Sequence, residues 1–446
     1  MKIFRAYDIR GIYKKDIDED IMQRIGRTFA SYIEENTAVV GRDFRIGSPE
    51  MKEAFVQGVL KSGKNVIDVG ALPLGTGMFH AWRKNLPFAY ITASHLPKEW
   101  TGVKFFHGNG IGFMEEEGKK IKEIFLKEDF SSGKGTLKKE KTSSIIEDYK
   151  DYLFSKIKPE RSLRLVLDPG NGAACVVADK IFKEAEFEVK TIFNEPDGNF
   201  PNRLPDPLED PLEKLRELSK NADLGIAYDG DGDRMVVVDD KGEKLSVEQA
   251  SFIMLEEILQ KEKGPIIANV ECTRTIDFIA KKFGRDVKRI KVGHTFLMEA
   301  VMKEKASFGL ETSGHFVIPS LLPYDDSLAV SFFFACILSK KSRPLSELVK
   351  QIPRYPFERI NLECDDERKF QIMKKITEKI RSQYTRVTTI DGVRVDLENG
   401  WVLIRPSNTS PVIRITVEAD TEENLKEMKE RFIHMVEEEI EKNQKA

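Results

Sequence analysis

Short apolar runs alternate with amphipathic segments along the first two-thirds of the chain. The first of these runs predict strands, at 39–40, 66–69 and 89–91. The stretch 50–61 has helical periodicity, and we expect Ser48 to cap its N-terminus with Pro49 in its first turn. Alternation of this kind is typical of βα units around a mainly parallel sheet.

Two further units of the same kind follow. One begins with a strand predicted at 163–167 and closes at the turn 239–242, and the next runs from 246 to 344. Each unit places a polar loop directly after a strand, which suggests that one α/β unit occurs three times. The polar, lysine-rich stretch 131–144 is predicted to be a loop near a boundary.

The C-terminal part of the chain has a different pattern. Asp391-Gly392 and Asn399-Gly400 are dipeptides that favour hairpin turns. We expect them to join three strands into an antiparallel meander, at 393–395, 401–404 and 412–417. A helix follows, with Asp420 as its expected N-cap. This pattern indicates a small α+β domain.

The length of 446 residues is too great for one hydrophobic core and suggests domains of about 100–150 residues each. We therefore predict an α/β protein of three similar α/β domains, with mixed but mainly parallel sheets, and a smaller C-terminal α+β domain. The predicted domains are 1–147, 148–245, 246–355 and 356–446.

Composition argues against several classes of partner. Charged residues make up 33% of the chain and the net charge is −3, so neither nucleic acid nor an anionic membrane is favoured. The four cysteines lack paired spacing, which indicates reduced thiols and neither a zinc site nor a disulfide framework. The N-terminus has no signal-peptide pattern, and we expect a cytoplasmic protein. Nothing in the sequence indicates an oligomeric state.

The most apolar segment, 329–338, is far shorter than the roughly 20 residues that span a bilayer. We predict a buried helix there, capped by Asp325 or Asp326.

Three carboxylates and two glycines alternate directly after the apolar run 224–227. Asp229, Asp231 and Asp233 would repel one another unless a cation joined them. Oxygen-only ligands suit Mg²⁺ or Mn²⁺ rather than zinc. A helix-loop-helix calcium site is excluded, because Arg234 and Asp240 stand where it needs glycine and glutamate. The alternative is an acidic surface turn.

Ser94 follows the predicted strand 89–91 and could act as a nucleophile at a strand end. No G-x-S-x-G motif surrounds it, and the ring of the adjacent His95 is not expected to face its hydroxyl, so a serine hydrolase is disfavoured. A serine that carries a phosphoryl group needs only a metal and nearby cations. The alternative is a serine that closes a turn through backbone hydrogen bonds.

Two more polar loops could bind a substrate. Glu311 and Ser313 could hold adjacent sugar hydroxyls, although a glutamate that caps a turn would fit as well. Residues 405–411 combine a guanidinium, hydroxyls and an amide, which suits a phosphate ester but also an ordinary hairpin loop.

Taken together, the four loops resemble those of the α-D-phosphohexomutase superfamily, in its phosphomannomutase/phosphoglucomutase branch. The matching segments occur in the family's order: 92–97, 229–234, 311–315 and 405–409, with further matches at 4–11, 102–104 and 293–294. Leu96 stands where the family usually has Asn, and Gly309-Leu310 replaces the usual Gly directly before Glu311.

The resemblance implies four domains around a central cleft and a role for each matching residue. Phosphorylated Ser94 and the three aspartates would hold one Mg²⁺. Candidates for proton handling are Lys104, Arg10 and His315. The sugar would be bound by Glu311, Ser313, His294, Tyr7 and Arg234. The phosphate would be bound by Arg405, Ser407, Asn408 and Thr409.

The implied activity is interconversion of hexose 1-phosphate and hexose 6-phosphate, a phosphotransfer of the isomerase class. It passes through a hexose 1,6-bisphosphate, which would be both its intermediate and its activator, and small sugar phosphates would be its partners. We expect mannose and glucose phosphates as substrates, because Gly232 and Ser407-Asn408-Thr409 argue against the phosphoglucosamine branch. Phosphoglucosamine mutase remains the alternative, followed by a Mg²⁺-dependent phosphatase and a non-catalytic sugar-phosphate sensor on the same fold.

Overall fold

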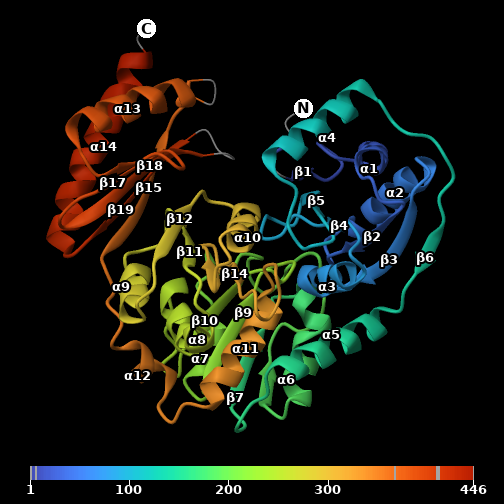
Figure 1. The fold of residues 1–446 in the computed structure, drawn as a ribbon, viewed down its shortest axis with the longest axis horizontal. Helices are drawn as coiled ribbons and strands as arrows, with labels where there is room; N and C mark the ends of the chain where they lie inside the picture. The colour runs from blue at the N-terminus through green and yellow to red at the C-terminus, as the bar shows by residue number, and fades with distance from the viewer. Residues whose placement is uncertain (1–2, 6–7, 366–367, 408–411, 445–446) are drawn as a thin grey trace.

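Four β-sheets, each with its own helices, make up the molecule (Figure 1). The computed structural model describes every residue except 1–2, 6–7, 366–367, 408–411 and 445–446. Figure 1 shows the four units following one another in an arc, with the first and the fourth at its two ends. Three units are α/β with mixed sheets and the fourth is α+β, which confirms the predicted fold class.

The first two units contain ten strands between them. The first comprises β1 (Ile9–Ile12), α1 (Glu19–Tyr32), β2 (Thr37–Arg42), α2 (Ser48–Lys61), β3 (Asn65–Ala71), α3 (Leu74–Lys84), β4 (Phe88–Ile91), β5 (Trp100–Phe106), α4 (Glu115–Lys127) and β6 (Leu137–Lys139). The second comprises α5 (Thr142–Lys156), β7 (Arg164–Asp168), the 3-10 turn η1 (Ala173–Val176), α6 (Ala178–Glu184), β8 (Glu188–Thr191), α7 (Glu213–Ser219), β9 (Leu224–Tyr228) and β10 (Met235–Val238).

The other two units complete the chain. The third comprises α8 (Val247–Lys261), β11 (Ile266–Asn269), α9 (Thr275–Lys282), β12 (Val287–Ile290), α10 (His294–Lys303), β13 (Phe308–Leu310), β14 (Phe316–Val317), α11 (Ser327–Ser339) and α12 (Leu345–Val349). The fourth comprises β15 (Phe357–Glu363), α13 (Lys369–Gln383), β16 (Val387–Thr388), β17 (Val393–Asp396), β18 (Gly400–Pro406), β19 (Val412–Ala419) and α14 (Glu422–Gln444).

The three α/β units share one strand arrangement. Four consecutive strands of each unit, which begin with β2, β7 and β11, have the same arrangement: the first of the four lies between the second and the third in parallel, and the fourth pairs antiparallel with the third. The orders are β3-β2-β4-β5, β8-β7-β9-β10 and β12-β11-β13-β14. In every unit, one predicted functional loop joins the third strand to the fourth. The repeat therefore delivers the serine, the aspartates and the sugar loop at equivalent positions.

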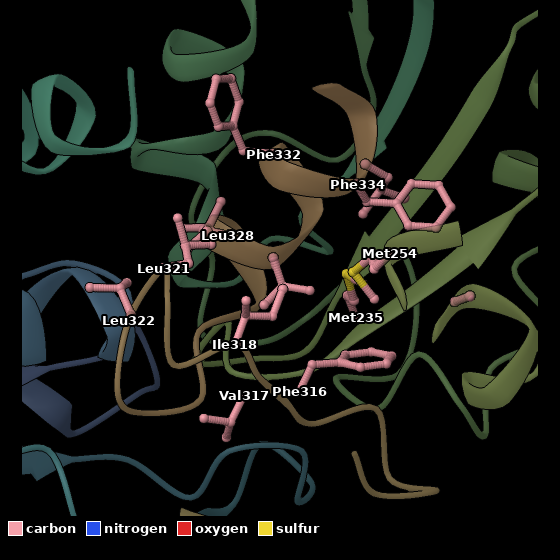
Figure 2. Close-up of a cluster of buried hydrophobic side chains, with 14 of the residues drawn as sticks. Met235, Met254, Phe316, Val317, Ile318, Leu321, Leu322, Leu328, Phe332 and Phe334 are labelled. Atoms are coloured by element: carbon pink, nitrogen blue, oxygen red, sulfur yellow. The ribbon is translucent and has the colours of Figure 1, made fainter. Parts of the chain in front are cut away.

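One apolar core runs through all three α/β units. It contains side chains as far apart in sequence as Val39 and Ile352, and Figure 2 shows the part of it around α11. Most of α11 is buried, as predicted for the most apolar segment, and Asp326 caps it by accepting a hydrogen bond from the Ala329 N–H. Among the described residues, no helix is long and apolar enough to cross a membrane.

Asp326 carries a carboxyl group inside this core, which makes stability depend on pH. Burial, with the neighbouring Asp325 adding to it, raises its pKa to about 7, although the Tyr149 hydroxyl donates to it at 2.7 Å. A free aspartate titrates near 3.9, so between about pH 4 and pH 7 the folded protein binds more protons than the unfolded chain. The stability that protonation provides is complete below about pH 4 and is lost as the pH rises to about 7.

We therefore expect Asp326→Asn to weaken the loss of stability between pH 4 and pH 8. The effect is at most about 4 kcal/mol, since each pKa unit corresponds to about 1.4 kcal/mol, and asparagine remains a good N-cap. Unfolding temperatures measured across this pH range test the expectation. Asp20→Asn, at an exposed position in α1, is the control and should parallel the wild type. If the unfolding temperature of Asp326→Asn varied with pH as that of the wild type does, the raised pKa of Asp326 would be contradicted.

Several local predictions differ from the structure. The N-cap of α2 is Gly47, and Ser48 is already in the helix. Residue 47 has φ +79°, and a β-carbon there would collide with the Tyr13 ring, so the position requires glycine. The N-cap of α14 is Thr421, which accepts from the Asn424 N–H, while Asp420 pairs with Arg274. The stretch 131–144 contains β6, and the predicted boundary after residue 147 falls within α5.

The fourth unit has its own core and packs against the third unit. Its five-stranded sheet, in the order β15-β19-β18-β17-β16, is antiparallel throughout and includes the predicted meander. Arg274 of the third unit reaches Glu418 at 3.0 Å and Asp420 at 2.7 Å, and Arg394 donates to the Val270 carbonyl at 2.7 Å. This docking places the end of β18 beside the loops of the third unit.

Candidate active site

The acidic loop between β9 and β10 is held by its own first residue. Oδ1 of Asp229 accepts hydrogen bonds from the backbone N–H groups of Gly232, Asp233 and Arg234, at 2.9–3.2 Å. This arrangement turns the three aspartates toward one another, so that one oxygen of each lies within 4.8 Å of the others. All three side chains are buried.

Ser94 lies directly against this loop although it belongs to the first unit. Its Oγ donates to Oδ2 of Asp229 at 2.9 Å. The two loops approach so closely that a β-carbon on Gly230 would lie 2.5 Å from the Ser94 carbonyl oxygen, which explains the glycine. The structure therefore brings together the serine and the aspartates, which are more than a hundred residues apart in sequence.

The charges in this cluster balance only in part. Burial and the neighbouring Asp231 and Asp233 raise the pKa of Asp229 well above its usual range. Lys104 of β5 offsets some of the negative charge, with its Nζ 3.0 Å from Asp231 and 2.6 Å from Asp233. Burial opposes the charge of Lys104, yet the two carboxylates still raise the pKa of the lysine.

The three aspartates fit a hard divalent cation. Oδ1 of Asp231 and Oδ1 of Asp233 are buried without a hydrogen-bond partner among the described residues. A buried carboxylate oxygen is ordinarily paired or metal-bound. The donors are all oxygens, as Mg²⁺ prefers, and the raised pKa of Asp229 shows that more positive charge would be accommodated. The same loop would leave Ser94 beside the ion.

Two stacked histidines stand next to the cluster. The rings of His294 and His315 lie 5.3 Å apart, and Oδ2 of Asp325 lies 3.4 Å from Nδ1 of the first and 2.8 Å from Nδ1 of the second. Arg234 donates from its Nε to Nε2 of His315 at 3.1 Å. Because a guanidinium N–H can only donate, Nε2 of His315 carries the lone pair, as a proton acceptor must.

The predicted sugar-binding loop, residues 311–315 between β13 and β14, places the side chains of Glu311 and Ser313 in different surroundings. Glu311 is buried, with Oε1 accepting from the Gly293 N–H at 2.6 Å and Oε2 accepting from the Ser313 hydroxyl at 3.1 Å. Ser313 lines the cleft, whereas Glu311 fixes the turn that precedes His294. Both oxygens of the Glu311 carboxylate therefore already accept hydrogen bonds within the protein, as in the turn-capping alternative.

Arginines gather at the predicted phosphate loop after β18. Glu271 of the third unit accepts from Nε of Arg405 at 2.9 Å and from Arg359 at 3.0 Å, and Arg414 lines the same wall. Ser407 also lines it. This cluster suits a dianionic phosphate, for which Glu271 holds the guanidinium groups in place. Asn408 and Thr409 lie outside the described residues, as does Tyr7.

A single cleft of about 710 Å³ connects the four loops. Each of the four loops contributes to its lining, through His95, Arg234, Ser313 and Arg405 among others. Arg10, which pairs with Asp8 at 2.6 Å, lies close enough to His95 to help lower its pKa. A volume of this size accommodates a hexose bisphosphate with its water.

His95 corrects one expectation from the sequence. Its Nδ1 lies 3.3 Å from Oγ of Ser94, although adjacency in the chain suggested that the ring would face away. Burial, together with Arg234 and Arg10, lowers the pKa of His95 well below its usual range, so the ring is neutral. Ser94 has a left-handed backbone, with φ +52°, and this conformation brings the two side chains to the same side.

Sequence reasoning missed Asp325 and Glu271 as members of the site. Asp325 was considered only as a helix cap, and Glu271 was not singled out. A usable signal existed for Glu271, which follows the apolar run 265–270, because ligand-binding residues collect at the carboxyl ends of parallel strands. Asp325 lies after a turn and offered no comparable signal.

Comparison with known families gives matches over almost the whole chain. Models of phosphoglucomutase/phosphomannomutase alpha/beta/alpha domains I, II and III match residues 1–132, 146–242 and 247–355. The model of the C-terminal domain of the same family matches residues 360–435.

Individual relatives agree with this result. A probable phosphoglucosamine mutase of Methanopyrus kandleri is 34% identical and covers 98% of both chains. A phosphoglucomutase/phosphomannomutase of Thermococcus kodakarensis is 31% identical over 98% of this chain and 99% of its own.

A solved structure from Burkholderia thailandensis, described as a phosphoglucomutase/phosphomannomutase family protein, superposes with a TM-score of 0.90. It is 29% identical and covers 98% of this chain and 97% of its own. Enzymes with the names of these relatives are phosphotransferases of the isomerase class. The chain is thus an enzyme that belongs to the phosphoglucomutase/phosphomannomutase family of the α-D-phosphohexomutase superfamily.

Proposed function

We propose that this enzyme transfers a phosphoryl group between the 1- and 6-positions of a hexose phosphate, with Ser94 as the carrier. The observation that carries this proposal is the 2.9 Å contact between Ser94 Oγ and Asp229, across two units of the fold. A hydroxyl that merely closed a turn would bond to nearby backbone. Ser94 instead points at an acidic cluster that fits a divalent cation.

The transfer proceeds in two halves. The bond between phosphorus and Ser94 Oγ breaks while a bond to the free sugar hydroxyl forms, which gives a hexose 1,6-bisphosphate. The bisphosphate then reorients within the cleft, and its other phosphoryl group is transferred to Ser94. Asp229, Asp231, Asp233 and an oxygen of phosphorylated Ser94 would hold Mg²⁺. When bound, this ion supplies positive charge to the oxygens of the transferring group.

Side chains of the cleft have complementary roles in this scheme. Nε2 of His315 accepts from Arg234 in this structure, and it is our candidate for accepting the proton of the attacking hydroxyl once that hydroxyl takes the place of Arg234. Lys104 and Arg10 bring positive charge toward the transferring group. Arg405, with Ser407, Asn408 and Thr409, binds the phosphate that is not reacting, and Ser313, Glu311, His294, Tyr7 and Arg234 hold the sugar.

For the substrate, we place glucosamine phosphate ahead of mannose and glucose phosphates. The relative from Methanopyrus kandleri is named for the amino sugar, and this similarity outweighs the sequence argument from Gly232 and the 407–409 segment. The cleft wall includes the exposed carboxylate of Glu209, which an ammonium group at C2 of the sugar could approach. The name of the Thermococcus kodakarensis relative keeps glucose and mannose as the second candidates.

Coupled assays of the four 6-phosphates, those of glucosamine, N-acetylglucosamine, glucose and mannose, test this order. We expect the highest kcat/KM with glucosamine 6-phosphate, by up to about fivefold, since an ion pair with an exposed carboxylate is worth at most about 1 kcal/mol. Glu209→Gln should lower that value and leave the glucose value unchanged. Equal rates on all four sugars, or a preference for mannose, would reject the amino-sugar assignment while leaving the mutase assignment intact. Release of free phosphate without isomerisation would indicate a phosphatase.

A further inference from the structure

A buried ion pair lies beneath Ser94, in the loop that follows β2. Asp43 is completely buried and Arg45 is 1% exposed, with the guanidinium Nε 3.2 Å from Oδ2 of Asp43. A guanidinium so deep in a protein requires several acceptors to replace its water. The groups that accept hydrogen bonds from Arg45 therefore indicate the role of this ion pair.

Arg45 uses its remaining donors on the loop that carries Ser94. Its terminal nitrogens donate to the carbonyl oxygens of Ser94, of Leu96 at 2.6 Å and of Pro97 at 2.8 Å. The guanidinium also lies over the ring of Phe200, 5.0 Å from its centroid. One side chain therefore fixes three carbonyl groups within four residues, which a single point charge could not do.

The other side of Ser94 is fixed through Asp43. The Thr92 hydroxyl donates to Oδ2 of Asp43 at 2.8 Å and accepts from the Ser94 N–H at 2.8 Å. The N–H and the C=O of Ser94 are thus both held, one through Thr92 and one through Arg45. These are the two groups that define a backbone conformation.

This conformation is one that serine rarely adopts. Ser94 has φ +52°, in the left-handed region that non-glycine residues avoid, and it places Oγ toward Asp229. Such strain persists only where the surroundings impose it, and it concentrates at functional sites.

We propose that Asp43, Arg45 and Thr92, together named the serine cradle, are positioning residues that hold Ser94 in the conformation needed to receive and donate a phosphoryl group. This inference rests on the proposed function, since it concerns the same serine. The Thr92 hydroxyl also lies 3.2 Å from Oδ2 of Asp231, so the cradle adjoins the ion site, but none of its three residues lines the sugar cleft. It acts by fixing the direction of Oγ, and a displacement of about 1 Å at a reacting atom can reduce a rate about 100-fold.

The test measures phosphoryl uptake by Ser94 directly. Dephosphorylated full-length protein is mixed with glucose 1,6-bisphosphate and Mg²⁺, and the mass increase of the intact chain is followed with time. Arg45→Lys keeps the charge but loses the planar fork, and Thr92→Val keeps the volume but loses the hydroxyl. Arg285→Lys is the matched control, because Arg285 also caps two carbonyl groups, those of Leu259 and Glu262, at the far end of α8.

We expect both cradle variants to take up phosphate about 100-fold more slowly than the wild type, and the control to match it. Hydrogen exchange should accelerate in the peptide 92–99 of the variants, with the rest of the molecule unchanged. Thr92→Val decides the question if Arg45→Lys does not fold. Uptake within twofold of the wild type, or slow uptake without faster exchange in that peptide, would overturn the cradle. No uptake by the wild type would instead refute the proposed function, and the cradle with it.

Discussion

Ser94→Ala is expected to lose at least about 10⁴-fold in turnover, because no other hydroxyl can replace a covalent carrier. The fold should survive, since alanine keeps the backbone contacts that Ser94 makes to Thr92 and Arg45. Sugar-phosphate binding should also survive, because the arginines near Glu271 belong to other units. Steady-state turnover and calorimetric binding of a hexose 6-phosphate, measured on the same sample, provide the two readouts.

Ser219→Ala is the appropriate control for this substitution. Ser219 is equally buried and is the last residue of α7. Its hydroxyl donates to the Leu215 carbonyl of the same helix. It should keep the activity of the wild type. If Ser94→Ala turned over at a similar rate, phosphoryl transfer would have to use another residue, and the role of the acidic loop would need a different explanation.

Asp231→Asn is expected to lower turnover about 100-fold or more. Substitution of a residue that only supports a metal ligand typically costs about 10- to 100-fold, and loss of a ligand itself should cost at least as much. The substitution removes one negative charge from the proposed ion site and leaves Lys104 with Asp233 as its remaining carboxylate partner. The affinity for Mg²⁺ should fall, so that excess ion restores only part of the activity. Titration with Mn²⁺, followed by electron paramagnetic resonance, measures the binding without reference to turnover.

The control for charge and burial is Asp239→Asn. Asp239 is a buried aspartate of the same unit, and its Oδ1 accepts from the N–H groups of Lys241 and Glu243 in a turn. Asparagine can accept the same two hydrogen bonds, so metal binding and turnover should stay as in the wild type. Unchanged Mn²⁺ affinity in Asp231→Asn would exclude Asp231 from the ion site.

The parts of the site that sequence reasoning located are short continuous motifs. Asp229, Asp231 and Asp233 lie within five residues, so their convergence depends on one tight turn rather than on the tertiary structure. Ser94 was identifiable because it follows a predicted strand. The fold class was accessible for a related reason, since the periodicity of βα units depends on local burial.

The parts that sequence reasoning missed depend on contacts between distant segments. Arg45 lies 49 residues from Ser94, and its hydrogen bonds reach that loop only because β2 and β4 are neighbours in the first sheet. Asp325 becomes a partner of two histidines through the packing of α10 against β14. The wrong helix caps had a more local cause. Ser48 and Asp420 are good capping residues, but the side chain of Ser48 bonds to the nearby Asp43 and that of Asp420 pairs with Arg274 of the third unit.

The equivalent positions of the serine loop, the acidic loop and the sugar loop separate the tasks of the enzyme. Each loop is anchored by its own third and fourth strands, so a change in one loop leaves the supports of the other two in place. Selectivity for the sugar can therefore evolve, or be engineered, at Thr312 and Ser313 of the 311–315 turn without rebuilding the nucleophile or the ion site. A triplicated architecture gives the protein modular freedom that a single-domain catalyst, whose functions share one set of strands, does not have.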